Sequence, residues 1–251
     1  GKEAARSSTG TQRNLTKSVI IGNQAGYVMT TGDSSTIIGY QAGYDLTTAN
    51  SNVLYGYRSG YNLTTGGHNT AIGYEALYTD TDGDYSVAVG YRALYSQSGD
   101  KQNTALGVNS GYNITSGPRN VLLGYNTGNT IENGEQNILI GHGADVGSTA
   151  GSNRIGIGYN VRVTADNTTV IGGAGQTKVT ISGSGVELTS HPVNNSTASF
   201  GMIRAKGTYE SSISLPNDSY VAHWSSTDAI IKARNLQAKG TDSAARDLHF
   251  M

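Results

Sequence analysis

The sequence predicts an all-β fold, a parallel β-solenoid of the β-roll or β-helix kind with seventeen-residue coils. Three observations lead to this prediction. A glycine recurs at a constant interval, a large apolar residue directly precedes it, and a mostly β-branched residue stands three positions before it. Equal intervals of this length indicate stacked copies of one supersecondary unit. The recurring glycines are Gly22, Gly39, Gly56, Gly73, Gly90, Gly107, Gly124, Gly141 and Gly158.

The composition suits such a repeat better than an ordinary packed enzyme. Among 251 residues there are 35 Gly and 16 Tyr, and only 14% are charged, against roughly 25% in average proteins. The net charge of -1 provides no clustered positive field for nucleic acid or an anionic membrane. Cysteine is absent, which excludes disulfides, thiolate zinc sites and a cysteine nucleophile. No apolar run is as long as a membrane span, so we expect no membrane insertion.

Residues 1–17 are predicted to be an N-terminal lead-in, and residues 18–172 the repeat shaft. Each repeat has one strand ahead of its glycine. The residues one and three positions before the glycine, such as Val53 and Tyr55, share one strand face, which we expect to point into the coil. The residue between them is uncharged, as at Ile20, Leu54 and Leu122, so the opposite face is expected to be buried as well. We predict that this second face packs against other copies of the chain in a homotrimer.

The rest of each coil is predicted to hold turns, a second short strand and stacked side chains. Segments such as Leu46–Thr48 and Leu63–Thr65 are interpreted as the second strand. Asparagine or serine stands four positions before the glycine in most coils, where its side chain can bond the backbone. Tyrosines one and five positions after the glycine are expected to form two ladders, either exposed to sugar rings or wedged between coils or chains. These are Tyr40, Tyr57, Tyr74, Tyr91, Tyr125 and Tyr159, and Tyr27, Tyr44, Tyr61, Tyr78, Tyr95 and Tyr112.

The repeat is predicted to end at Gly172, which follows the preceding glycine after a shortened coil that resembles a terminal cap. Residues 173–194 are expected to form a neck with a strand at Lys178–Ser182, and residues 195–251 a small β-rich C-terminal tip. The tip cluster Tyr220, His223 and Trp224 is the candidate receptor-binding site, because the repeat places no structural demand on it. The competing interpretation is that Trp224 belongs to the core of the tip.

The segments Asn69–Tyr74 and Asn103–Gly107 resemble the head repeats of trimeric autotransporter adhesins, which are parallel β-rolls that assemble as trimers. The likeness covers Ser18–Gly172. The adhesin repeat is usually shorter, and the tyrosines and Leu-Thr-Thr segments look more like the repeats of bacteriophage tail fibres and tailspikes. Many such fibres carry a C-terminal intramolecular chaperone, similar to that of endosialidases, that trimerises the chain and cuts itself off. By this resemblance Met251 is either the processed C-terminus or a fragment boundary.

Few residues indicate chemistry. The cluster Asp80, Asp82 and Asp84 has oxygen ligands at alternate positions that could hold a cation, and a solvated turn is the alternative. The same carboxylates with Glu75 are candidates for sugar cleavage by their proximity in the sequence only. No histidines are paired closely, and nucleophile-elbow and phosphate-loop motifs are absent. We therefore expect no catalytic residues, no metal and no cofactor.

The function expected from these observations is that of a homotrimeric, non-enzymatic receptor-binding fibre of a phage tail, located in the virion. Its partners would be a bacterial surface glycan or outer-membrane protein, with other tail proteins at its N-terminal side. Three identical weak sites on one rod would bind together by avidity. The alternatives are a trimeric adhesin on the bacterial cell surface and a tailspike that depolymerises polysaccharide.

Overall fold

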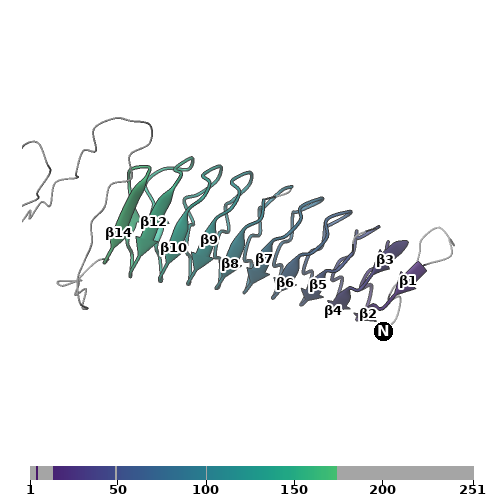
Figure 1. Cartoon of the computed structure of the whole chain (residues 1–251). Coiled ribbons are helices and arrows are strands. Elements are labelled where there is room, and N and C mark those ends of the chain that lie inside the picture. The colour runs from purple at the N-terminus through teal and green to yellow at the C-terminus, as the bar shows by residue number, and fades with distance from the viewer. Residues whose placement is uncertain (1–3, 5–13, 49, 100, 174–251) are drawn as a thin grey trace, which may run out of the picture. The chain divides into compact units, whose positions relative to one another are not determined.

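The computed structural model describes residues 4, 14–48, 50–99 and 101–173, which form a stack of similar coils (Figure 1). The chain divides into two units, Gly1–Gly183 and Ser184–Met251, and every described residue belongs to the first. These residues form strands joined by turns and bends, with no helix among them and hence none that could cross a membrane. The neck strand and the tip predicted beyond Gly173 lie outside the described residues.

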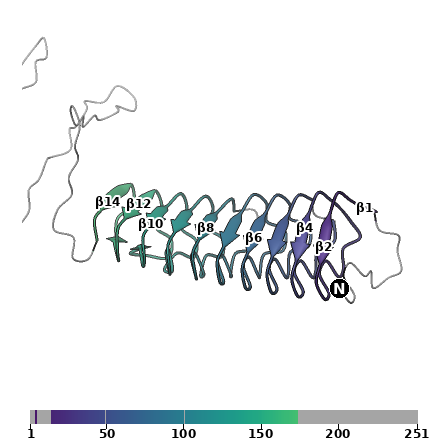
Figure 2. The same cartoon turned by 90° about the horizontal axis from the view of Figure 1, so that it is seen from below.

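One parallel sheet of ten strands runs along the stack, and its strands lie in a single row (Figure 2). Each coil contributes one strand of three or four residues. The strands are β2 (Val19–Ile21), β4 (Thr36–Ile38), β5 (Val53–Tyr55), β6 (Thr70–Ile72), β7 (Val87–Val89), β8 (Thr104–Leu106), β9 (Val121–Leu123), β10 (Ile138–Ile140), β12 (Arg154–Ile157) and β14 (Thr168–Ile171).

The register confirms the predicted coil length. Val53 in β5 lies opposite Thr70 in β6, an offset of seventeen residues that is kept from β2 to β12. The final pairing is shorter, because Ile155 lies opposite Thr169, fourteen residues later. The parallel β-solenoid and its shortened last coil are therefore confirmed.

The recurring glycine is required for both conformation and space. Gly39 has a φ of 140°, which side chains of L-residues rarely adopt. A Cβ atom added to it would lie 2.2 Å from the carbonyl oxygen of Gly56 in the next coil. The Gly39 N–H also donates a 2.8 Å hydrogen bond to Ile21 of the preceding coil. The glycine therefore lets the backbones of adjacent coils approach closely where each strand ends.

The prediction of which strand face points inward was wrong. Leu54 and Leu122, the middle residues of β5 and β9, are completely buried inside the coil, and Ile20 packs against the same core. The flanking residues point outward, and Val53 and Tyr55 are 37% and 54% exposed. The middle position carries neither threonine nor tyrosine, whereas the flanking positions carry both. The face that we predicted to pack between chains is thus the interior of each chain.

The prediction of a second strand in every coil was also wrong. Leu46–Thr48 and Leu63–Thr65 contain bends and no strand, although Thr47 and Thr64 each donate a backbone N–H to the next coil. Second strands are present only toward the ends of the described stack. There β1 (Asn14–Thr16) pairs with β3 (Thr31–Asp33), and β11 (Asp145–Val146) pairs with β13 (Arg162–Val163).

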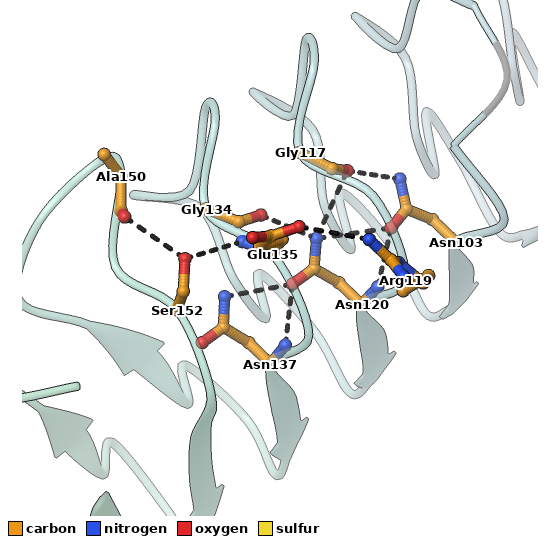
Figure 3. Close-up of polar contacts among 9 residues, drawn as sticks. All are labelled: Asn103, Gly117, Arg119, Asn120, Gly134, Glu135, Asn137, Ala150 and Ser152. Atoms are coloured by element: carbon orange, nitrogen blue, oxygen red, sulfur yellow. Dashed lines mark hydrogen bonds and ion pairs between the residues drawn. The ribbon is translucent and has the colours of Figure 1, made fainter. Parts of the chain in front are cut away.

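A column of buried asparagines links successive coils (Figure 3). The Asn120 side chain donates to the carbonyl oxygen of Gly134 at 2.9 Å, and its Oδ1 accepts the backbone N–H of Asn137 at 2.9 Å. Asn103 makes the equivalent bonds one coil earlier, to Gly117 and Asn120. Each side chain therefore satisfies backbone groups that have no water available. This confirms the predicted bonding of these residues to the backbone at turns.

An arginine ends this column at the last full coil. Arg154 takes the position of the next asparagine, and its N–H donates to Oδ1 of Asn137 at 3.1 Å. Its buried guanidinium forms an ion pair with Asp166 at 2.7 Å and donates to the carbonyl oxygen of Val163. Hydrogen bonds from Ser152 first, and then from Arg154, lower the pKa of Asp166 below its ordinary value of 3.8. The shortened coil is thereby fastened to the coil before it.

The core is rearranged in the middle of the stack. In four coils a leucine or isoleucine at the strand centre is followed six positions later by a glycine, as in the pair Leu54 and Gly60, where an added Cβ on the glycine would meet the leucine at 2.9 Å. The coils of β6 and β7 instead combine an alanine at the strand centre with a buried leucine at the glycine position, as in the pair Ala71 and Leu77. Leu77 has a φ of 54°, the conformation that glycine adopts in the other coils. The apolar volume has moved from the strand to the turn.

Candidate functional site

Two surfaces of the stack are candidates for function, the outer face of the ten-stranded sheet and the tyrosine ladders beside it. Each strand of the sheet presents two side chains outward, and none of them is charged. Most are valine, isoleucine or leucine, with four threonines and Tyr55 among them. Val19, Leu106 and Ile171 are 48%, 51% and 52% exposed. We call this surface the outer strand face.

The outer strand face runs along the whole ten-stranded sheet. Ten strands spaced by about 4.8 Å place the first and last strands about 43 Å apart. Monomeric soluble proteins rarely expose a contiguous apolar patch of more than a few hundred Å². Continuous apolar surface of this length indicates an interaction surface.

The predicted tyrosine ladders are confirmed. Ladder A consists of the rings that directly follow the repeat glycine, and ladder B of the rings four positions later. Neighbouring tyrosines are stacked throughout ladder B and from Tyr40 to Tyr91 in ladder A, with centroids between 4.8 and 5.3 Å apart, close to the strand spacing. Farther along ladder A, Tyr125 stacks on His142, and the His142 ring is tilted by 32° against Tyr159. Ladder A is exposed, whereas the rings of ladder B are half-buried. Ladder A begins with Tyr40, Tyr57, Tyr74 and Tyr91, and ladder B comprises Tyr27, Tyr44, Tyr61, Tyr78, Tyr95 and Tyr112.

A row of polar side chains lies between the two ladders. The Arg92 guanidinium carbon is 5.1 Å from the ring centre of Tyr91 in ladder A and 5.3 Å from that of Tyr95 in ladder B. Its Nε donates to the Glu75 carboxylate at 2.8 Å, and this bond is the main reason that the pKa of Arg92 is raised. Arg58 donates in the same way to Gln41. In this part of the stack the row is therefore linked from coil to coil.

The carboxylates of the predicted acidic turn form neither a fully solvated turn nor a shared cluster, because one of them is buried. Asp80 is buried, and its carboxylate accepts hydrogen bonds from Gln97 at 2.8 Å and from the backbone of Gly99 and Gly83. Burial raises the pKa of Asp80, and these bonds partly offset the increase. Asp84 accepts the backbone N–H of Gly67.

These carboxylates therefore do not converge on one point. Asp82 accepts a hydrogen bond from the neighbouring hydroxyl of Thr81. The part of the chain that the structure describes contains no group of three His, Cys, Asp or Glu side chains placed to hold a metal ion. Glu75, the fourth candidate for sugar cleavage, is buried in its ion pair with Arg92. Cation binding and sugar cleavage at this turn remain predictions.

The other predicted site residues, Tyr220, His223, Trp224 and Met251, lie outside the described residues. The polar row and the outward position of the β-branched face were missed from the sequence. Val108 and Asn129, which replace tyrosines in ladders A and B, were a signal that the repeat alignment already contained. No family model, curated protein or solved structure matches this chain, so its function has to be inferred from its own residues.

Proposed function

We propose that the chain is a homotrimeric, non-enzymatic receptor-binding fibre of a phage tail, whose coils form a rigid shaft. The observation that carries the proposal is the outer strand face, which is uncharged along the whole ten-stranded sheet. A shaft that functioned alone would expose this face to water, at a cost of roughly 25 cal/mol for each Å² left unburied.

A second copy of the chain is the partner that fits this face best. The outward side chains recur at the spacing of the strands, about 4.8 Å. A partner must match this spacing over about ten strands, and another copy of the same sheet does so without any adjustment. Three copies arranged about one axis would cover the outer strand faces and leave the tyrosine ladders outside. This assembly replaces the one predicted through Leu54 and Leu122, which lie inside the coil.

The two ends of the proposed fibre would have different partners. Other tail proteins would attach at the N-terminal side, and the C-terminal tip with Tyr220, His223 and Trp224 would contact a bacterial surface glycan or an outer-membrane protein. Three weak sites on one rigid body raise the apparent affinity by multivalency. The fibre would be part of the virion. A bacterial surface adhesin would use the same shaft, with its base in the cell envelope instead.

The proposal is tested with the whole chain in two measurements. Sedimentation equilibrium is expected to give three times the 26.2 kDa of one chain. Fluorescently labelled protein is then incubated with intact bacteria of several species, and saturable binding to some of them is expected. A stable monomer, or the absence of binding to every species, would contradict the proposal. Release of new reducing ends from purified surface polysaccharide would favour the depolymerase instead.

A further inference from the structure

The two tyrosine ladders are interrupted in successive coils of the stack, ladder A after Gly107 and ladder B in the coil after Gly124. Ladder A has Val108 where the ring after Tyr91 should stand, and it resumes with Tyr125. Ladder B ends at Tyr112, because Asn129 takes the next position. Tyr91 and Tyr112 therefore each stack on a ring of the preceding coil and meet no ring in the following coil. We call this place the ladder break.

A surface cavity of about 500 Å³ lies at the ladder break. Its lining includes both of these rings, the Arg92 side chain, and the side chains of Asn109, Asn126 and Asn129. This volume falls within the range of roughly 300–1,000 Å³ that is typical of small-molecule sites. The cavity thus combines two aromatic rings with a cluster of amides.

The lining amides at the ladder break differ in how the fold uses them: Asn129 Oδ1 accepts a hydrogen bond from the Asn113 amide at 3.3 Å, whereas two others are not bonded as their counterparts in earlier coils are. The polar row of the earlier coils bonds in pairs, with Arg58 donating to Gln41 and Arg92 donating to Glu75 in the preceding coil. Asn109 and Asn126 occupy the same row, yet within the described residues neither side-chain amide makes a hydrogen bond to protein. Each amide offers one acceptor and two donor hydrogens. The side chains of the row therefore bond one another before the cavity, whereas Asn109 and Asn126 at the cavity have donors and acceptors available for a ligand.

We propose that the ladder break binds a neutral pyranose ring of a bacterial surface glycan. An aromatic ring gives the apolar face of a sugar a surface on which to stack, and asparagine amides can bond pairs of hydroxyl groups as both donor and acceptor. We expect a neutral ligand because the Glu75 carboxylate lies 2.8 Å from Nε of Arg92 and offsets the charge of the guanidinium. This inference rests on the proposed receptor-binding function, and it places a binding site on the shaft in addition to the tip.

The test uses the whole chain and the methyl glycosides of glucose, galactose, mannose and rhamnose, with methyl glucuronide as the charged comparison. Saturation-transfer NMR, with irradiation of the tyrosine ring protons, detects weak binding. We expect millimolar binding of at least one neutral glycoside, since a single sugar residue makes few contacts. Methyl glucuronide should bind at least tenfold more weakly.

Two sets of variants locate the site. The double variant Val108→Tyr with Asn129→Tyr continues both ladders through the break, so it should fill the cavity, keep or raise the melting temperature, and reduce binding at least tenfold. Tyr112→Leu and Tyr27→Leu remove the rings at the two ends of ladder B, and so form a matched pair. Tyr112→Leu should abolish binding, and Tyr27→Leu should leave it unchanged.

The outcomes separate this inference from the proposed function. Loss of sugar binding in the filled variant and in Tyr112→Leu, with binding kept in Tyr27→Leu, supports a site at the ladder break. Unchanged binding by the filled variant would overturn it, as would loss in both ladder-end variants. Failure of the native chain to bind any neutral glycoside would also overturn it. In each of these negative cases, labelled protein that still binds intact cells leaves the fibre proposal standing.

Discussion

Asn120→Ala removes a middle member of the buried asparagine column. Two backbone groups lose their partner: the N–H of Asn137, which donates to Oδ1 of Asn120, and the carbonyl oxygen of Gly134, which accepts from its Nδ2. Both groups are buried, so water cannot replace the lost bonds without opening the coil. A buried polar group left unpaired costs about 1–3 kcal/mol, so the variant should lose about 2–6 kcal/mol of unfolding free energy.

Urea unfolding followed by circular dichroism measures this loss, at one fixed chain concentration because assembly adds to stability. The control is Asn133→Ala, which removes an exposed amide of the same coil that bonds Ser116 and should cost less than about 1 kcal/mol. Asn120→Ser should fall between them, since Ser35 accepts the N–H of Asn52 in the same way. Hydrogen exchange at the Asn137 amide should be faster in the alanine variant. If Asn120→Ala costs no more than Asn133→Ala, the asparagine column does not hold the coils together.

Two further predictions concern the core and the last coil. Ala71→Leu alone should lower the unfolding free energy by about 1–3 kcal/mol through overpacking, and Leu77→Gly alone by about 2–5 kcal/mol through a cavity, whereas the double variant should lose less than either. Additive losses in urea unfolding would show that the two side chains do not fill the same space. Asp166→Asn should lower the urea midpoint at neutral pH. The difference from the native chain should vanish as the pH falls below 3.8, because a carboxylate with a lowered pKa stabilises the fold only while it is charged. A difference in midpoint that persists in acid would exclude the ion pair with Arg154 as its cause.

The sequence predicts the stacking well because the repeat restricts a few positions tightly. Gly39 must be glycine for its φ of 140° and its contact with Gly56, so spacing alone reveals the coil length. The tyrosines stack because their spacing along the chain equals one coil, and the shortened last coil is visible as a shorter interval.

The strand faces are harder to predict, because both lack charge. Alternation shows that Val53 and Leu54 point in opposite directions, but it does not say which direction is inward. The coil interior is enclosed completely, so it excludes the threonine hydroxyls and the tyrosine that the outward positions accept. That restriction could have identified Leu54 as the inner residue.

The candidate sites depend on exceptions to the repeat. Val108 and Asn129 are visible in the sequence as missing tyrosines, yet only the structure shows that Asn129 and the last rings before the two gaps, Tyr91 and Tyr112, line one cavity with Arg92. At Asp80 the sequence was misleading, because its neighbouring aspartates indicated a solvated turn. There the chain moves the apolar volume of the coil to Leu77 and buries the carboxylate against Gln97, an exchange that depends on three-dimensional packing.

The central claim is that the outer strand face is covered by other copies of the chain. Sedimentation equilibrium of the variant Val53→Lys with Leu106→Lys, compared with the native chain, tests it directly. Both residues point outward and are more than one-third exposed, so a single chain should tolerate the change. We predict three times 26.2 kDa for the native chain and 26.2 kDa for the folded variant. A native chain that sediments as a monomer, or a variant that remains a trimer, would contradict the claim.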